Sequence, residues 1–107
     1  MAIILTNGNL LEGDAGVASK IDYVVSGLDG TTLIRLASGQ LAAAKATLYT
    51  AVGTDTISSI TLFNTHTVAM AVNLYVQDGT ASRQVVGIDS LGAGYHAQFD
   101  GNKLTIE

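Results

Sequence analysis

The sequence predicts an all-β protein: a single antiparallel β-sandwich domain, jelly-roll-like or immunoglobulin-like, over residues 1–107. Two observations favour this class. Apolar and polar residues alternate with a period of two in several segments, which is the period of a half-buried strand. Asx-Gly pairs, which are strong hairpin signals, separate the apolar segments. The pairs are Asn7-Gly8, Asp29-Gly30, Asp78-Gly79 and Asp100-Gly101.

Length and composition fit one domain with one core. The chain has 107 residues, of which 48% are hydrophobic and 13% are charged, a composition far from that of disordered chains. Five basic and nine acidic residues give a net charge of −4, which disfavours nucleic acid as a partner. Cysteine is absent, so disulfides and thiolate chemistry are excluded.

The first residues show no targeting signal. Met1 to Leu5 contain no basic segment, and polar Thr6 follows at once. This apolar stretch is too short for a signal peptide or a membrane span. We therefore expect an unprocessed protein with no membrane association.

Ten strands are expected in order along the chain, each a short apolar or β-branched run bounded by turn residues. They are Ile3–Leu5, Asn9–Glu12, Lys20–Gly27, Thr32–Leu36, Ala46–Thr50, Ile57–Asn64, Val68–Gln77, Ser82–Asp89, Tyr95–Asp100 and Lys103–Ile106. Alanine-rich Leu41–Lys45 is the one candidate helix, but it lacks a good N-cap, so we expect one turn at most.

The alternation is clearest in two of these strands. In the strand at 57–64, Ile60 and Leu62 share one face, which we assign to the core. In the strand at 68–77, every second residue from Val68 onward is apolar, and the opposite face is small and weakly polar. That second face would let another sheet or subunit approach closely. The predicted core consists of Ile60, Leu62, Met70, Val72, Leu74, Val76, Val86 and Ile88.

Histidine, serine and acidic residues are the candidates for chemistry. His66 and His96 lie in no metal-binding motif, and we expect His66 in a polar loop and His96 facing solvent. Serines that could join them in a triad lie in no nucleophile elbow. These serines are Ser58, Ser59, Ser82 and Ser90. We therefore predict no catalytic residue, no metal site and no cofactor.

The remaining candidates favour structural roles. Glu12 and Asp14 flank Gly13 and are expected in a solvated turn. The glycines of 13–16 and 92–94 match no phosphate-binding motif and indicate turns. Six aromatic residues are scattered without interleaved cations, which favours core positions over a stacking platform. They are Tyr23, Tyr49, Phe63, Tyr75, Tyr95 and Phe99.

The block from Ala37 to Gly94 resembles a family of small virion proteins of tailed bacteriophages. The resemblance lies in the strings "LASGQLAAAKATLYTA", "ISSITLFNTHTVAMAVNLYVQDGTASRQV" and "SLGAGY". Its motifs are Gly39-Gln40-Leu41, Thr47–Thr50, Leu62–Thr65, Val72–Val76, Gly79–Arg83 and Leu91–Tyr95. The segment Leu10–Leu28 is also similar to an adjoining part of such proteins. Val52-Gly53-Thr54-Asp55 replaces the family's proline-containing turn, so we expect a looser loop there.

The resemblance implies a β-sandwich module with a role in virion assembly and no enzymatic activity. The expected protein is a capsid decoration protein, located in the virion, that binds other virion proteins such as the major capsid, neck or tail protein. We expect a homo-oligomer, with a trimer as the favoured form and the edge strands Ile3–Leu5 and Leu104–Ile106 as contacts. The alternatives are a tail or neck accessory module, a receptor- or carbohydrate-binding module at the tail tip, and, third, a small hydrolase.

Overall fold

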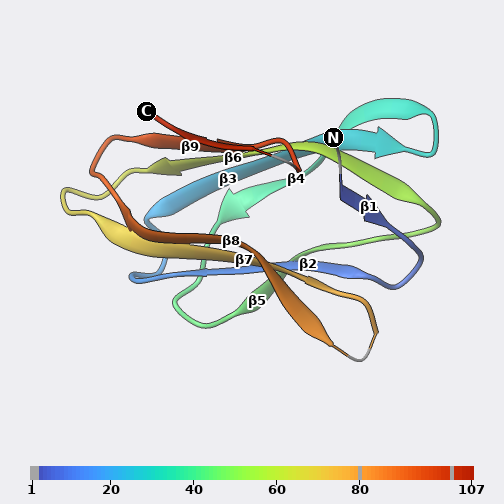
Figure 1. Ribbon diagram of the computed structural model, residues 1–107, viewed down its shortest axis with the longest axis horizontal. Helices are drawn as coiled ribbons and strands as arrows, with labels where there is room; N and C mark the ends of the chain where they lie inside the picture. Colours follow the sequence, from blue (N-terminus) through green and yellow to red (C-terminus); the bar gives the residue numbers. More distant parts are fainter. Residues whose placement is uncertain (1–2, 80, 102) are drawn as a thin grey trace.

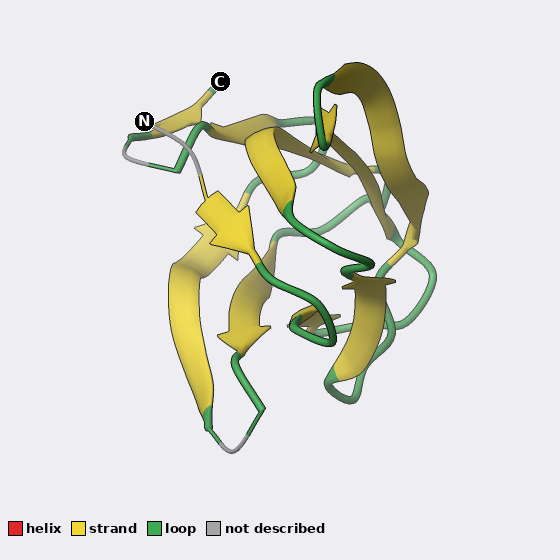
Figure 2. Ribbon diagram, turned by 90° about the vertical axis from the view of Figure 1, so that its right-hand side faces the viewer, coloured by secondary structure: helices red, strands yellow, loops and turns green. Residues whose placement is uncertain are grey.

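The computed structural model describes residues 3–79, 81–101 and 103–107, and these residues form two antiparallel sheets that face each other (Figure 1). The described part contains strands and loops but no helix (Figure 2). Sheet A consists of β1 (Ile3–Leu5), β3 (Ile21–Asp29), β4 (Thr32–Gln40), β6 (Asp55–Asn64), β9 (His96–Phe99) and β10 (Leu104–Ile106). Sheet B consists of β2 (Leu10–Ala15), β5 (Ala46–Thr50), β7 (Met70–Gln77) and β8 (Ser82–Leu91). The predicted all-β sandwich is confirmed.

Strand β6 is the centre of sheet A. Its first edge pairs with β3, and its second edge pairs with both β1 and β9. The order is β10-β9-β6-β3-β4 in sheet A and β5-β2-β7-β8 in sheet B. In an immunoglobulin domain the first two strands pair in one sheet, whereas here β1 and β2 lie in different sheets.

Of the four Asx-Gly pairs, Asn7-Gly8, Asp29-Gly30 and Asp78-Gly79 lie at one end of the sandwich, on the right in Figure 1, whereas Asp100-Gly101 follows β9 nearer the middle of sheet A, where Phe99 pairs with Ile60 of β6. Three of them connect the paired strands of the hairpins β3–β4, β7–β8 and β9–β10. Asn7-Gly8 is different, because β1 pairs with β6 and the chain then crosses to β2 in the other sheet. The hairpin predicted at Asn7-Gly8 is therefore wrong, although the turn is real and Gly8 has a φ of 88°.

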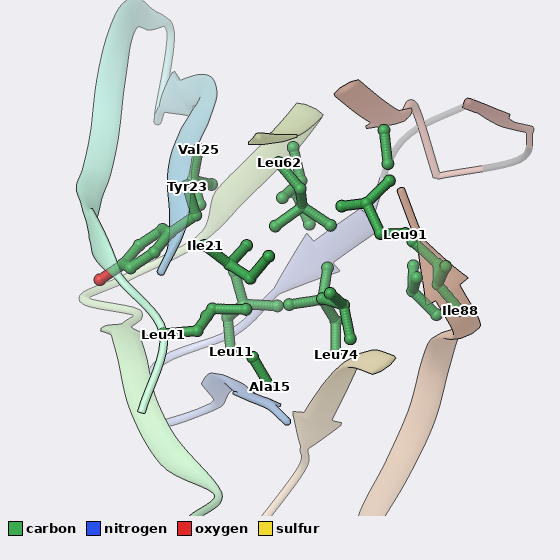
Figure 3. Packing of buried hydrophobic residues seen from close by; sticks show 14 of the residues in the cluster. Leu11, Ala15, Ile21, Tyr23, Val25, Leu41, Leu62, Leu74, Ile88 and Leu91 are labelled. Carbon is green, nitrogen blue, oxygen red and sulfur yellow. The ribbon is translucent and has the colours of Figure 1, made fainter. Parts of the chain in front are cut away.

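The core lies between the sheets (Figure 3), and both sheets and two loops, at 41–45 and 51–54, contribute to it. Seven of the eight predicted core residues are buried, and Val76 is half-buried against them. The other buried apolar residues are Leu5, Leu11, Ala15, Ile21, Tyr23, Val25, Leu41, Ala51, Ile57, Leu91 and Ala97. Burial of a large apolar side chain stabilises the fold by roughly 1.5–3 kcal/mol.

Two local predictions need correction. Val68 lies outside β7 and is 54% exposed. Strand β2 continues to Ala15, so Glu12 and Asp14 lie on a strand and not in a turn. Gly13 allows this, because a Cβ there would lie 2.9 Å from Leu74 Cδ2 in the core.

The alanine-rich segment at 41–45 is a loop with a bend at 43–44. Its first residue, Leu41, is completely buried and holds the loop in place. The Leu41 N–H donates to Ile21 O, and Leu41 O accepts from the Ser19 N–H, both at 3.0 Å. These bonds to another loop and strand hold the segment in an extended path.

We call the end with the first three Asx-Gly pairs the turn end. The opposite end, on the left in Figure 1, is the loop end. It contains the loops 16–20, 41–45, 65–69 and 92–95, which connect strands of different sheets. These loops contain no acidic residue.

Candidate functional site

The two histidines lie near the loop end and serve no common site. His66 is half-buried in the 65–69 loop, where its backbone N–H donates to Asn64 Oδ1 at 2.8 Å. His96 begins β9 and is exposed, as expected, with its ring 4.5 Å from the ring of Phe63. Among the described residues, no group of three or more His, Asp or Glu side chains could hold a metal ion.

The four candidate serines do not join a histidine in the described part of the chain. Ser58 Oγ donates to Ser26 O at 3.1 Å, and Ser82 Oγ donates to Glu12 Oε1 at 3.0 Å. Ser59 lies in β6, and Ser90 lies in β8. No hydrogen bond among the described residues assembles a Ser-His-Asp triad, and these residues enclose no pocket.

A polar network covers the outer face of sheet B, the face expected to be small and weakly polar. Asp14 accepts hydrogen bonds from Asn73 Nδ2 at 2.9 Å and from the Tyr75 hydroxyl at 3.1 Å. Gln84 Nε2 donates to Asn73 Oδ1 at 2.9 Å, which extends the network to β8. Burial, and then the hydrogen bond and charge of Asp14, raise the pKa of Tyr75.

Lys45 adds a cation to this network. Lys45 Nζ lies 4.5 Å from the centre of the Tyr75 ring and 3.3 Å from Ser82 Oγ. The ammonium group therefore occupies one face of the ring, in the geometry of a cation–π contact. Glu12 and Asp14, the two carboxylates flanking Gly13, thus lie in one hydrogen-bonded surface that also includes Ser82 and Tyr75.

Asn64 is the polar residue that organises the loop end, and sequence reasoning did not single it out. It is completely buried at the end of β6. Its Nδ2 donates to Val68 O at 3.0 Å and to Leu91 O at 2.9 Å. Its backbone N–H donates to Tyr95 O at 3.1 Å, and its carbonyl accepts from the Gly94 N–H at 3.0 Å. Together with the bond from His66, these contacts tie two loops to β6.

Asp55 is the other completely buried polar residue among those described, at the opposite end of β6. Its Oδ2 accepts from the Tyr49 hydroxyl at 2.5 Å and from the Val52 N–H at 3.3 Å. Its Oδ1 is buried without a hydrogen-bond partner. Because Tyr49 lies in β5, this pair links sheet B to sheet A.

The Tyr49–Asp55 pair also helps to fix the conformation of the 51–54 loop, which was expected to be looser than the family's proline-containing turn. Burial of Tyr49, its hydrogen bond to Asp55 and the charges of Asp55 and Asp29 raise the pKa of Tyr49 to about 12. The Val52 N–H bonds to Asp55, and the Gly53 N–H donates to Asn7 Oδ1 at 3.2 Å. Side chains from two sides therefore anchor the loop.

The glycine segments are structural elements. Gly13 lies within β2, and the Gly16 N–H donates to Ala71 O at 3.0 Å just beyond it. Gly94 has a φ of 74°, which favours glycine. A Cβ at Gly92 would lie 3.1 Å from Tyr95 Cδ1.

The aromatic residues follow the core prediction in part. Tyr23 is buried, whereas Tyr49, Phe63, Tyr75 and Phe99 are half-buried. The core prediction is wrong for Phe63 and Tyr75, which are not among the residues packed against the core cluster, and for Tyr95, which is exposed at the loop end. Its ring lies against Gly92, which has no side chain to displace it.

Comparisons with protein-family models, curated proteins and solved structures found no match to this chain. In the described residues, no helix is long and apolar enough to cross a membrane.

Proposed function

We propose that the chain is a non-enzymatic structural protein of a tailed-bacteriophage particle, in the first instance a capsid decoration protein. In this role it self-associates and binds other virion proteins, and it is located in the virion. The proposal rests on the resemblance carried by the motifs between Gly39 and Tyr95. These motifs describe strands and turns, so a structural role is the simplest one they imply.

One structural observation supports the proposal: the motif residues are the ones that hold the loop end together. Asn64 belongs to the Leu62–Thr65 motif and bonds to the carbonyl of Leu91, which begins the Leu91–Tyr95 motif. Leu41, from a third motif, is buried in the core and bonds to β3. Residues of the motifs that carry the resemblance thus help to hold the scaffold together, which supports a structural role.

Immunogold labelling of the encoding phage's particles tests this proposal. We expect label on the capsid, and purified chain should bind capsids stripped of accessory proteins. Label on the neck or tail would replace decoration by the accessory-module alternative. Particles without label, from a preparation in which the capsid protein is labelled normally, would contradict the virion role.

A receptor- or carbohydrate-binding module at the tail tip is the second candidate. The observation in its favour is the outer face of sheet B, where Asp14, Asn73 and Tyr75 lie together. An aromatic ring beside carboxylate and amide groups is a common sugar-binding arrangement, but Lys45 covers one face of this ring. Binding to a glycan array that Tyr75→Ala abolishes would favour this candidate over decoration.

A further inference from the structure

Sheet A ends in a long edge strand, β4, whose only bulge is at Leu36, because Val25 pairs with Ala37 and Ser26 with Arg35; the part before Leu36 is weakly protected. β4 has nine residues, and within the described chain it pairs only with β3. Natural proteins protect such edges with short strands, β-bulges, lysine, proline or inward-pointing charges. β4 contains neither lysine nor proline, and Arg35 is its only charged residue. By comparison, β10 at the other edge of sheet A has three residues.

At the free edge of β4, alternate residues beginning with Leu33 direct their backbone N–H and C=O groups away from β3. Asp29 and Thr32 are register partners that flank a two-residue turn, in which Gly30 has a φ of 63°. The residues that flank such a turn bond to each other, and the bonding direction then alternates along the strand. Leu33 and Arg35 therefore direct their N–H and C=O groups away from β3.

The same part of β4 leaves apolar side chains uncovered on both faces. Leu33 is 73% exposed on the outer face of sheet A, and Ile34 is 39% exposed on the other face. The register places Leu33 beside Leu28, Leu28 beside Thr56, and Thr56 beside Ile4. Ile4 is 67% exposed. We call this row of four residues the Leu33 stripe; it crosses sheet A and stops at the β4 edge.

We propose that β4 pairs with β4 of a second copy of this chain, in antiparallel register, about a two-fold axis at Leu33. Each Leu33 N–H then donates to Leu33 O of the other copy, and Arg35 pairs with Thr31 of the other copy. The directions of the free backbone groups agree with this register. The Leu33 stripe continues across the axis into the same stripe of the second copy. One largely apolar row therefore crosses sheet A of both copies.

The charge distribution favours a second copy of this chain as the partner of β4, and it favours the proposed register. With a net charge of −4, two copies repel each other over most of their surfaces, but β4 has a cation and no acid. The proposed register keeps the two Arg35 side chains four positions apart along the ladder. It also places each Arg35 beside the turn that carries Asp29 of the other copy, within about a Debye length. An unrelated strand would not supply the matching Leu33 and Asp29.

The pairing rests on the self-association proposed above and gives it a site. It predicts a two-fold dimer through β4, in place of a trimer through the short strands at 3–5 and 104–106. A five-residue ladder is a small interface, and small interfaces are weak and transient. The dimer fraction should therefore increase with protein concentration.

Light scattering of the purified chain over a wide concentration range tests the pairing. We expect a monomer–dimer equilibrium that Leu33→Lys shifts to monomer, by at least about tenfold in dissociation constant, because two like charges then oppose each other at the axis. Ile4→Lys is the matched control. It adds the same charge to an equally exposed position of the Leu33 stripe, away from the edge, and should leave the dimer intact. An equal increase of the dissociation constant in both variants would indicate that the dimer forms by stacking of the outer faces of sheet A. That result would overturn edge pairing.

A disulfide trap tests the register. Residues that exchange backbone bonds in antiparallel strands have Cα atoms about 5.5 Å apart, which is within the range that a disulfide spans. Leu33→Cys should therefore give a covalent dimer under mild oxidation, whereas Val68→Cys, an exposed position at the loop end, should not. Equal cross-linking of both variants, a strict monomer or a trimer would each overturn the proposal.

The failure of this pairing is distinguishable from that of the virion role. A chain that pairs through Leu33 in solution but leaves phage particles unlabelled contradicts only the virion role. A chain that binds capsids as a monomer at every concentration contradicts the pairing and the self-association but leaves the virion role intact.

Discussion

The two ends of β6 each contain a completely buried polar residue, and the two residues are satisfied very differently. Asn64, at the loop end, uses both amide hydrogens, its side-chain oxygen and both backbone groups. Asp55, at the turn end, has two bonds to Oδ2 and none to its buried Oδ1. Both residues are 0% exposed, so the difference lies in their partners and not in their access to water.

The comparison shows how one strand holds two kinds of buried polar contact. A neutral amide with every group bonded has little desolvation left uncompensated, whereas a carboxylate with an unbonded buried oxygen keeps part of that cost. Asn64 therefore contributes stability through several carbonyls at once. Asp55 depends mainly on one hydroxyl, that of Tyr49. The predictions below remove these partners in turn.

Asn64→Ala should have the largest effect. It leaves Val68 O, Leu91 O and the His66 N–H without their side-chain partner, and we expect the free energy of unfolding to fall by about 2–4 kcal/mol. Asn73→Ala removes a half-buried amide from the sheet B network and is the matched control, with an expected loss within about 1 kcal/mol. Urea unfolding followed by circular dichroism measures both. Equal losses would contradict the central role of Asn64.

Tyr49→Phe should have the next largest effect. It leaves Asp55 with only the Val52 N–H, and the expected loss is about 1–3 kcal/mol. Tyr75→Phe removes a hydroxyl that also bonds to an aspartate, but on an outer face, so its loss should stay below about 1 kcal/mol. The same urea titration compares them. A larger loss in Tyr75→Phe would place the important tyrosine–carboxylate bond on the surface.

The Tyr49–Asp55 bond should also appear in the pH dependence of stability. Folding raises the pKa of Tyr49 from 10.0 to about 12. A group with a raised pKa contributes stability that is complete below its unfolded value and is lost as the pH rises through the folded value. The difference in unfolding free energy between wild type and Tyr49→Phe should therefore be constant below pH 10 and decrease between pH 10 and about 12. A difference that persists unchanged to pH 12 would contradict the assignment.

The smallest effect is expected from the histidines. His66→Asn keeps the backbone N–H that bonds to Asn64, and His96→Gln loses only an exposed ring contact. We expect each variant, and the double variant, to unfold within about 0.5 kcal/mol of wild type. Thermal unfolding provides the measurement. A loss in His66→Asn as large as that of Asn64→Ala would move the main contact from the asparagine to the histidine side chain.

Local patterns predict the strands, most turn positions and the part of the core on β6, β7 and β8, because alternation and Asx-Gly chemistry act over a few residues. The prediction of strand pairing fails where the paired strands are far apart in the sequence. Nothing near Asn7-Gly8 indicates that β1 pairs with β6. The role of Asn64 is hidden for the same reason, since its partner Leu91 is 27 residues away and offers only a backbone carbonyl. For Asp55, the tyrosine six residues before it in the sequence indicates a candidate hydrogen-bond partner. Nothing in the sequence indicates that Asp55 is buried.

The shared second edge of β6 has a consequence for the order of folding. β1 occupies that edge beside Asp55–Ile57, and β9 occupies it beside Ile60–Phe63. The edge is therefore completed by the first and the ninth strands, which are far apart along the chain. Such contacts are formed late, because long loops must close before they are gained. During synthesis, Ile60–Phe63 of β6 should remain unpaired on this side until β9 has left the ribosome, which makes this part of the edge the point most exposed to misassembly.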